Sequence, residues 1–509
     1  MFIRSGKLEE REYQKNIFES AKDVNTLVVI PTGLGKTVIS IMIADYRLSR
    51  YSNSQVLFLA PTKPLISQHY KTFYSIMDIP LGMVSGEVPA GERKNVYEVS
   101  RIVFATPQTI ENDLDKRILN LSKFSLLVVD EAHHTIGNYS YVKIAKEYMA
   151  SAQHPLIIAL TASPASDREK ISAICQNLSI SNVEMRAEDD PDVARYVKSK
   201  VVEEIRLKLT KEIEEIVVRL QLFTQEQIAA LQNIGLLKTA SLKKINRVTI
   251  LMLQKSLQAR MLSGKRNFYT IRGIIITSKL LKLYHAMLLI STQSIGAFNR
   301  FLNKILKEGT SKTDKELAKS AEIQWMYKES KRLLDAGLEH PKLAKLSRIL
   351  SESFSPDQRA IIFTQYRDTV DVICNMLKGV KDIRPVKFIG QGKGGLSQKE
   401  QVEIIRGFEE GVYNVLVSTS VSEEGISIKG VDLAIFYETI PSGIRSIQRR
   451  GRVGRFNAGK IFILITEGTN DEGYYWAAKH KESRMKKLIK KIKSNPETLK
   501  NDGTLNPFV

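Results

Sequence analysis

The sequence predicts an α/β fold in which two doubly wound parallel-sheet domains are separated by a helical insertion. Short apolar runs alternate with segments of helical periodicity in residues 1–200 and again in residues 341–478. Residues 201–340 show helical periodicity without comparable runs, and residues 479–509 form a basic tail. A chain of 509 residues is too long for one hydrophobic core, so several domains are expected.

The expected strands are continuous apolar runs, which is typical of parallel strands that helices cover on both faces. In the first domain these runs are residues 27–30, 56–61, 102–107, 126–130 and 156–161. In the second domain they are residues 360–364, 386–390, 415–419, 433–437 and 461–466. Ligands of such sheets bind beyond the carboxyl ends of the strands, so the residues that follow each run are the candidates for chemistry.

Charge narrows the class of partner. Lys and Arg number 76 against 55 Asp and Glu, and the resulting net charge of +21 favours a polyanion, nucleic acid before a membrane surface. The excess is localised, because residues 227–307 contain 14 Lys and Arg and no Asp or Glu. A helical spacer that happens to be basic is the alternative explanation for this stretch.

Other classes are excluded by composition. Cys175 and Cys374 are the two cysteines, too few for a disulfide framework or a Cys-based zinc site, and this usage suits a reducing cytosol. The N-terminal residues lack the apolar core of a signal peptide, and no run of about 18 apolar residues suits a membrane span. We therefore expect a soluble, intracellular protein with no membrane partner.

A PTGLGKT turn follows the first strand and opens a helix. In that context the backbone of Thr32, Gly33 and Gly35 can cradle phosphate oxygens at the helix N-terminus. Lys36 can reach the β- and γ-phosphates, and the Thr37 hydroxyl can ligate Mg²⁺. The turn therefore predicts a site for ATP with Mg²⁺.

Asp130 and Glu131 follow the apolar run 126–130 at the same edge of the predicted sheet. Asp130 is placed to hold Mg²⁺ through water, and Glu131 to orient the water that attacks the γ-phosphate. In the second domain, the string QRRGRVGR begins at Gln448 and carries four arginines with glycines between them. Arginine suits bidentate contact with phosphate, so ATP is expected in the cleft between the two domains.

Taken in order, these strings resemble the motifs of a superfamily-2 helicase, which implies two RecA-like domains. The motifs in the first domain are Tyr13-Gln14, PTGLGKT, APTKPLISQH (60–69), TPQT (106–109), DEAH (130–133) and Thr161-Ala162-Ser163. The motifs in the second domain are IIFTQYRDT (361–369), STSVSEEGISI (418–428) and QRRGRVGR (448–455).

The narrower resemblance is to the Hef/FANCM group of DNA translocases. It rests on TPQTIENDL (106–114), DEAHHTIGNYSYV (130–142), FIGQ (388–391) and GLSQKEQ (395–401), and on the long helical insertion, which engages branched DNA in that group. Fused archaeal Hef proteins continue into an XPF-type nuclease with an ERKxxxD site. Glu92-Arg93-Lys94 lies instead in the first domain with Glu98 at the Asp position, which we interpret as coincidence. We expect a motor without the nuclease, acting with a separate structure-specific nuclease or a sliding clamp.

The resemblance also implies a role for each site residue. Gln14 would bind adenine, Gln448 would help to order the attacking water, and Arg452 and Arg455 would be arginine fingers. His133, Thr161 and Ser163 would couple the nucleotide site to the DNA-facing surface. The expected nucleic-acid contacts, which position a strand without reading its sequence, are Thr62, Lys63, Thr106, Gln108, Thr109, Thr364, Gln365, Ser418 and Thr419, with Lys243, Lys244 and Arg247 in the insertion.

The favoured function is ATP-dependent remodelling of forked or branched DNA, such as stalled forks and Holliday-like junctions, in repair and recombination at the nucleoid. Two other functions stay open. One is an RNA-directed ATPase that resembles the Dicer or RIG-I-like group, which also carries a helical insertion. The other is a non-enzymatic DNA-binding platform that recruits a nuclease. The nucleic acid that stimulates ATP hydrolysis distinguishes these functions.

Overall fold

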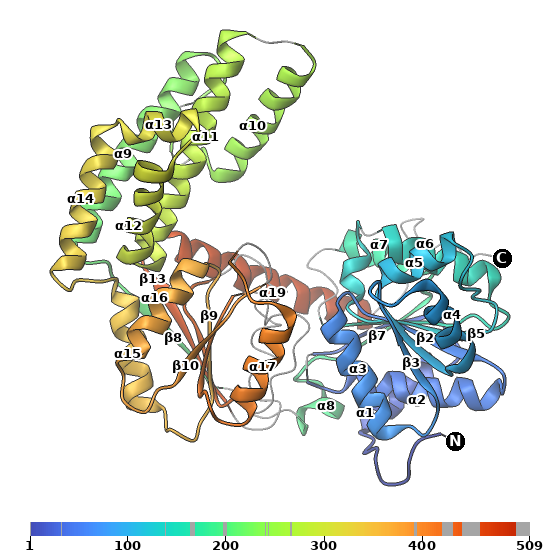
Figure 1. Ribbon diagram of the computed structural model, residues 1–509. Helices are drawn as coiled ribbons and strands as arrows, with labels where there is room; N and C mark the ends of the chain where they lie inside the picture. The colour runs from blue at the N-terminus through green and yellow to red at the C-terminus, as the bar shows by residue number, and fades with distance from the viewer. Residues whose placement is uncertain are drawn as a thin grey trace.

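The computed structural model describes residues 2–31, 33–137, 139–162, 168–196, 201–239, 241–242, 244–264, 267–390, 394–419, 431–439 and 459–494. These residues form two parallel α/β domains and a helical bundle (Figure 1). The bundle is attached to the second α/β domain on the side away from the first. The predicted fold class is confirmed.

The sheet of the first domain has seven parallel strands in the order β3-β4-β2-β5-β6-β1-β7. Their bounds are β1 (Thr26–Val29), β2 (Gln55–Leu59), β3 (Leu81–Val84), β4 (Ile102–Ala105), β5 (Phe124–Val129), β6 (Ile157–Thr161) and β7 (Asn182–Met185). The predicted apolar runs coincide with β1, β2, β4, β5 and β6. The edge strands β3 and β7 were not predicted, because β7 mixes polar and apolar residues and the short run of β3 is interrupted by Gly82.

The sheet of the second domain has six parallel strands in the order β10-β11-β9-β12-β13-β8. Their bounds are β8 (Val201–Leu207), β9 (Ala360–Phe363), β10 (Pro385–Phe388), β11 (Val415–Ser418), β12 (Leu433–Phe436) and β13 (Lys460–Thr466). The prediction that the helical insertion begins at residue 201 needs correction, because β8 pairs with β13 along its whole length. Most residues of this edge strand are exposed and three of its seven residues are charged, so its sequence resembles the charged helix that follows it.

Helices cover both faces of each sheet. In the first domain they are α1 (Glu12–Ala21), α2 (Lys36–Arg50), α3 (Lys63–Ile76), α4 (Ala90–Val99), α5 (Pro107–Asp115), η1 (Ala132–Thr135), α6 (Tyr139–Ser151), α7 (Arg168–Asn177) and α8 (Pro191–Ala194). In the second domain they are α15 (Pro341–Ser353), α16 (Arg367–Leu377), α17 (Gln398–Glu409) and α19 (Asn470–Ser494). The predicted basic tail from residue 479 therefore begins inside α19.

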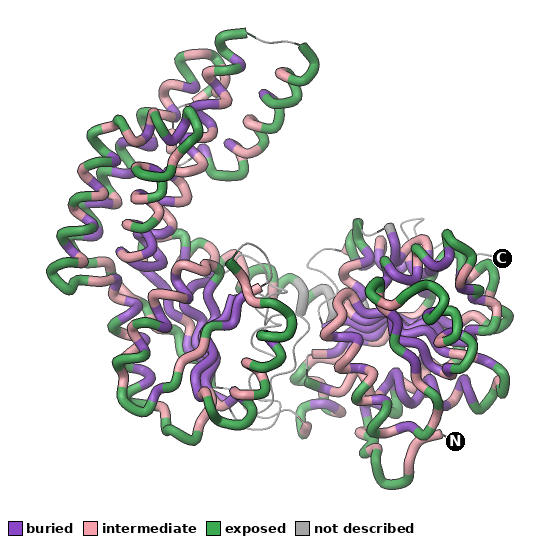
Figure 2. The backbone as a smooth tube through the Cα atoms, viewed as in Figure 1, coloured by how far each residue is buried: buried purple, intermediate pink, exposed green. Residues whose placement is uncertain are grey.

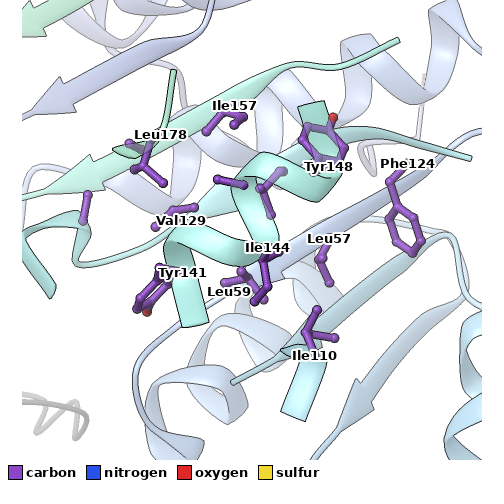
Figure 3. Packing of buried hydrophobic residues seen from close by; sticks show 14 of the residues in the cluster. Leu57, Leu59, Ile110, Phe124, Val129, Tyr141, Ile144, Tyr148, Ile157 and Leu178 are labelled. Carbon is purple, nitrogen blue, oxygen red and sulfur yellow. The ribbon is translucent and has the colours of Figure 1, made fainter. Parts of the chain in front are cut away.

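The central strands are buried on both faces, as their apolar runs predict (Figure 2). Figure 3 shows one of these faces, where α6 packs on the sheet of the first domain. Tyr141, Ile144 and Tyr148 of this helix belong to the same buried cluster as Leu57 of β2 and Val129 of β5. This packing holds the carboxyl ends of the central strands in fixed positions.

The helical bundle consists of α9 (Lys211–Asn233), α10 (Arg247–Leu262), α11 (Phe268–Leu288), η2 (Leu289–Gln293), α12 (Ile295–Asn303), η3 (Lys304–Glu308), α13 (Lys312–Ala318) and α14 (Ala321–Asp335). Within the described ranges, Phe268–Gln293 is the one segment with the length and mean hydropathy, 1.5, of a membrane-crossing helix, which the sequence prediction did not anticipate. It packs against α9, α10 and α13, so its apolar character is accounted for by the interior of the bundle.

A buried polar junction joins the bundle to the second domain at η2. Lys342 at the start of α15 and Asp471 at the start of α19 form an ion pair in which neither side chain is more than 2% exposed. Lys342 also donates to the Thr292 carbonyl over 3.0 Å. The carboxylate of Asp471 accepts the backbone N–H of Thr466 at 3.2 Å. The bundle and the second domain are therefore connected by buried hydrogen bonds as well as by the chain.

His340 completes this junction as a neutral imidazole. Its Nε2 lies 3.2 Å from the Ser291 carbonyl, and its Nδ1 accepts the backbone N–H of Lys342 over 3.2 Å, so the two partners require opposite roles from the two ring nitrogens. Burial, with a further contribution from the Lys342 charge, lowers the pKa of His340 from 6.5 to about 3.

This lowered pKa predicts an acid-sensitive junction. The folded-state pKa of His340 lies below the unfolded-state value, so its contribution to stability is complete above about pH 6.5 and is lost as the pH falls toward 3. The loss is about 1.4 kcal/mol per pH unit in this window. Melting curves at pH 7.5 and 5.5 should show a larger decrease for the wild type than for His340→Gln, which keeps a donor toward Ser291. Equal decreases would contradict the assignment.

Candidate ATP and nucleic-acid site

The carboxyl ends of the central strands of the first domain lie in one row. Leu59 at the end of β2 pairs with Ala105 of β4 on one side and Val129 of β5 on the other. Farther along the sheet, Thr161 of β6 pairs with Val29 of β1. The residues that follow these strands therefore share one edge, with the predicted nucleic-acid contacts after β4 and β2 and the predicted ATP site after β5, β6 and β1.

The turn after β1 has the backbone that a phosphate cradle requires. Gly33 and Gly35 have φ values of 90° and 76°, in the left-handed region that favours glycine, and α2 begins at Lys36. A Cβ atom on Gly35 would lie 2.5 Å from Gln14 Nε2, so a larger residue would require this amide to move as well. Thr32 lies outside the described residues.

Lys36 and Glu131 face each other across this edge, with Nζ and Oε1 3.9 Å apart. Glu131 has a φ of 50°, uncommon for a residue with a side chain, and such strain clusters at functional sites. Burial by itself raises the pKa of Glu131, but Lys36 and the neighbouring His133 lower it, and the net pKa is about 2. Glu131 is therefore a carboxylate at neutral pH.

Asp130 and Thr37 are bridged by His69, which comes from α3. The Nε2 atom of His69 lies 2.7 Å from Asp130 Oδ2, and its Nδ1 atom lies 3.4 Å from Thr37 Oγ1. The other carboxylate oxygen, Asp130 Oδ1, is buried and has no hydrogen-bond partner among the described residues. The two predicted metal ligands are thus brought together, and one carboxylate oxygen is available for a ligand.

These residues fit Mg²⁺ and a nucleotide. Mg²⁺ is usually held by one or two carboxylates together with substrate phosphates, and the buried Asp130 Oδ1 and the hydroxyl of Thr37 supply the oxygen ligands. The described residues contain no group of three or more His, Cys, Asp or Glu that could hold a metal ion. Lys36 and the glycine turn would hold the phosphate oxygens.

His133 lies between this site and the end of β6. Its Nδ1 is 3.3 Å from Thr161 Oγ1 and 3.3 Å from Glu131 Oε2. The geometry suits the predicted coupling role, which stays a prediction. Ser163 lies outside the described residues.

Gln14 is held against the phosphate-binding turn. Its Nε2 donates to the Leu34 carbonyl over 3.3 Å, and its Oε1 accepts the backbone N–H of Arg11 over 2.9 Å. The neighbouring Tyr13 hydroxyl donates to the same carbonyl. The amide therefore supports the turn, and its contact with adenine stays a prediction.

The nucleic-acid residues predicted in the first domain are at helix N-termini. Thr62 and Thr106 are the N-cap residues of α3 and α5, and neither side chain caps its helix. The hydroxyl of Thr106 instead lies 2.9 Å from the hydroxyl of Thr109, and Gln108 is exposed. The first-turn N–H groups of both helices are thus without a side-chain cap, as phosphate binding requires. Lys63 pairs with Glu87 at 2.5 Å.

The predicted contacts in the second domain differ in burial. Gln365 is exposed, whereas Thr364 and Ser418 are fully buried and Thr419 is 6% exposed. The Thr364 hydroxyl donates to Gln293 Oε1 over 3.4 Å, so it is part of the bundle junction and not of the domain surface, contrary to the prediction. Thr364 does follow a strand, β9, as predicted, but Gln293 of the bundle contacts it there. Gln448, Arg452 and Arg455 lie outside the described residues.

Part of the positive charge of residues 227–307 is neutralised by acidic residues of α13, which follows this stretch in the sequence. Arg272 and Lys279 of α11 pair with Glu316 of α13 at 3.3 and 2.6 Å, and Lys282 pairs with Asp314. The expectation of an acid-free face is therefore wrong for α11, because the fold brings acids from outside residues 227–307 against it.

Lys244 and Arg247 remain exposed at the start of α10, while Lys243 lies outside the described residues. The Arg247 charge lowers the pKa of His285, which burial already lowers, and it opposes the burial that raises the pKa of Tyr366 to about 12. Arg247 therefore lies near Tyr366, next to the exposed Gln365.

Sequence reasoning missed two residues of the site. His69 ends the APTKPLISQH string, but nothing in its spacing indicates contact with Asp130. The Tyr141 hydroxyl is buried without a hydrogen-bond partner beside Asp130 and Glu131, whose charges add to the burial that raises the pKa of Tyr141. Glu92-Arg93-Lys94 lies on α4, where Arg93 donates to the buried Asp113 over 2.7 Å, which accounts for this string structurally.

Three family models match successive parts of the chain. The family described as "Type III restriction enzyme, res subunit" matches residues 7–166. The "Putative ATP-dependent RNA helicase, helical bundle" matches residues 209–340, and the "Helicase conserved C-terminal domain" matches residues 341–457. The start of the helical match agrees with the bundle boundary after β8.

Relatives and a solved structure cover nearly the whole chain. A putative ATP-dependent RNA helicase of Methanocaldococcus jannaschii is 39% identical over 96% of this chain, which spans 62% of that relative. The ATP-dependent DNA helicase fml1 of Schizosaccharomyces pombe is 34% identical over 91% of this chain, which spans 57% of it. The Hef helicase domain of Pyrococcus furiosus is 39% identical with a TM-score of 0.73, covering 94% of this chain and 100% of that one. This chain therefore belongs to the Hef/FANCM group of ATP-dependent superfamily-2 helicases.

Proposed function

We propose that this chain is an ATP-dependent DNA translocase that remodels forked or branched DNA. The observation that supports this function best is the row of strand ends in the first domain. Phosphate-binding and acidic groups follow β1 and β5, and helix N-termini without side-chain caps follow β2 and β4. A nucleotide and a nucleic-acid strand would therefore contact neighbouring parts of one rigid edge.

The residues of the nucleotide site have separable tasks. Bound ATP with Mg²⁺ would supply the phosphoanhydride bond whose hydrolysis releases energy. Lys36 would stabilise negative charge on the phosphates, and Asp130 with Thr37 would hold the metal. Glu131 has a pKa of about 2, so it is ionised at neutral pH and would orient the attacking water molecule as a hydrogen-bond acceptor.

Selectivity for a branch would come from the bundle. Lys244 and Arg247 are exposed, and the Arg247 charge acts on Tyr366, so the basic start of α10 would continue the strand-binding surface of the second domain. Phe268 and Tyr269 of α11 are 73% and 57% exposed, and exposed aromatic rings can stack on unpaired bases. The relative fml1 is named a DNA helicase, and a relative from Mus musculus is named a Fanconi anemia group M protein homolog, which also favour DNA.

An RNA substrate is the second candidate. The relative from Methanocaldococcus jannaschii and the family model of the bundle are both described as putative ATP-dependent RNA helicases. Contacts with the phosphate backbone would serve either nucleic acid, because such contacts carry no sequence information.

The deciding experiment is the ATPase rate with a DNA fork, linear duplex, single-stranded DNA and RNA of matched length. We expect the fork to stimulate hydrolysis most. Stronger stimulation by RNA would favour the second candidate. A protein that hydrolyses no ATP with any of them would be a binding platform.

Replacing Lys244 and Arg247 together by Glu should lower the ratio of fork affinity to single-strand affinity, because four units of charge change near the proposed branch. The plot of log affinity for the fork against log salt should also become less steep by about two units, one for each lost phosphate contact. Lys328→Glu with Lys331→Glu on α14 is the matched control, since both side chains are exposed outside the basic stretch. An unchanged ratio would show that the bundle is a spacer.

A further inference from the structure

His69 lies between the two residues that are predicted to bind metal. It is 5% exposed, and its Nε2 and Nδ1 atoms lie 2.7 Å from Asp130 Oδ2 and 3.4 Å from Thr37 Oγ1. The ring packs against Phe58 of β2, with the ring centroids 4.5 Å apart. The imidazole is therefore held on three sides, by a carboxylate, a hydroxyl and an aromatic ring.

The partners determine which ring nitrogen carries the proton. A carboxylate oxygen that carries no proton accepts hydrogen bonds, so Nε2 of His69 would donate to Asp130, and in the tautomer with its proton on Nε2 the Nδ1 atom carries a lone pair. In this tautomer the Thr37 hydroxyl would donate to the Nδ1 lone pair, and the lone pairs of its own oxygen would point away from His69. On the other side the bond from Nε2 occupies Asp130 Oδ2, while Oδ1 stays buried without a partner. One imidazole thus orients two oxygen ligands.

We propose that His69 is a positioning residue for the divalent metal of the nucleotide site. The inference rests on the proposed function, because it takes Thr37 and Asp130 as the metal ligands. A histidine that orients metal ligands through hydrogen bonds typically changes metal affinity by about 10–100-fold when it is removed. His69 lies two turns into α3, about 9 Å along the axis from Lys63. It therefore connects the metal ligands to the helix whose first turn carries a predicted nucleic-acid contact.

A histidine whose only role was to form a hydrogen bond with the buried Asp130 carboxylate would make the same contacts. The test must therefore distinguish an effect on metal binding from an effect on protein stability. The measurement is binding of a fluorescent ATP analogue at increasing Mg²⁺ concentration, with the melting temperature recorded for each variant. In His69→Ala, the Mg²⁺ concentration for half-maximal enhancement of binding should rise about 10–100-fold. Binding in the presence of EDTA should stay at the wild-type level.

Two conservative variants test the two hydrogen bonds of the imidazole separately. They also decide whether His69 positions the metal ligands if the alanine variant does not fold. The amide nitrogen of Gln can reach the position of Nε2, so His69→Gln should keep the bond to Asp130 and lose the acceptor for Thr37. His69→Asn places its amide near Nδ1 and should do the reverse. Each should need more Mg²⁺ than the wild type and less than His69→Ala. His154→Ala is the control, because His154 is an exposed histidine stacked on Tyr51.

Different outcomes would contradict the positioning role of His69 and the proposed metal site. If Mg²⁺ enhances nucleotide binding to the wild type and the His69 variants respond at the same Mg²⁺ concentration within about twofold, His69 is structural and only this inference is overturned. If Mg²⁺ has no effect on nucleotide binding by the wild type, the metal site itself is misassigned and the proposed function falls with it.

Discussion

Replacing Lys36 with Ala is expected to lower ATP hydrolysis by at least about 10³-fold while nucleic-acid affinity changes little. The variant removes the ammonium group that would stabilise phosphate charge. It also leaves Glu131 buried without its strongest favourable charge, so the pKa of Glu131 should rise. The predicted nucleic-acid contacts after β2 and β4 do not involve Lys36. Steady-state hydrolysis and equilibrium binding of a labelled fork measure the two effects separately.

Glu131→Gln separates the carboxylate from the ammonium. It keeps the shape of the side chain and removes the negative charge that would orient the attacking water, so hydrolysis should fall by a similar factor while nucleotide binding is retained. Lys143→Ala is the matched control, because this partly exposed lysine of α6 pairs with Asp115 in the same domain. A Lys36→Ala protein that hydrolyses ATP near the wild-type rate would remove the assigned site.

Replacing Asp471 with Asn is expected to destabilise the second domain by about 3–5 kcal/mol, because it leaves the Lys342 ammonium buried without a counter-charge. Burial already raises the pKa of Asp471, and Lys342 opposes that rise, so the pair compensates only part of its own desolvation. The melting temperature should fall by roughly 10 °C.

Adding Lys342→Met should restore most of the lost stability. The double variant removes both buried charges of the Lys342–Asp471 pair, and the Asn side-chain oxygen can still accept the backbone N–H of Thr466. If the double variant is no more stable than Asp471→Asn alone, the charge is not the cause of the loss. The same junction explains why the bundle cannot be tested by deleting residues 201–340, since that deletion removes β8 and the Thr292 acceptor of Lys342.

The parts of the fold that were predicted from sequence are those with a strong local pattern. The interior strands β1, β2, β4, β5 and β6 are continuous apolar runs because helices cover both faces. The edge strands β7 and β8 mix charged or polar residues with apolar ones, and the four-residue run of β3 is interrupted by Gly82, so no long apolar run marks these strands. For the same reason β8 was assigned to the helical insertion.

The amino-acid sequence by itself identified the candidate residues of the ATP site, because a glycine turn before a helix and an acidic pair after a buried strand are local patterns. Parallel pairing then brings Lys36 and Glu131 together. Only the tertiary structure decided which distant groups meet: His69 with Asp130 and Thr37, Gln293 with Thr364, and Glu316 with the lysine and arginine of α11. Such contacts depend on how separate elements pack, and packing that joins residues far apart in the chain leaves no periodic or local signal in the sequence.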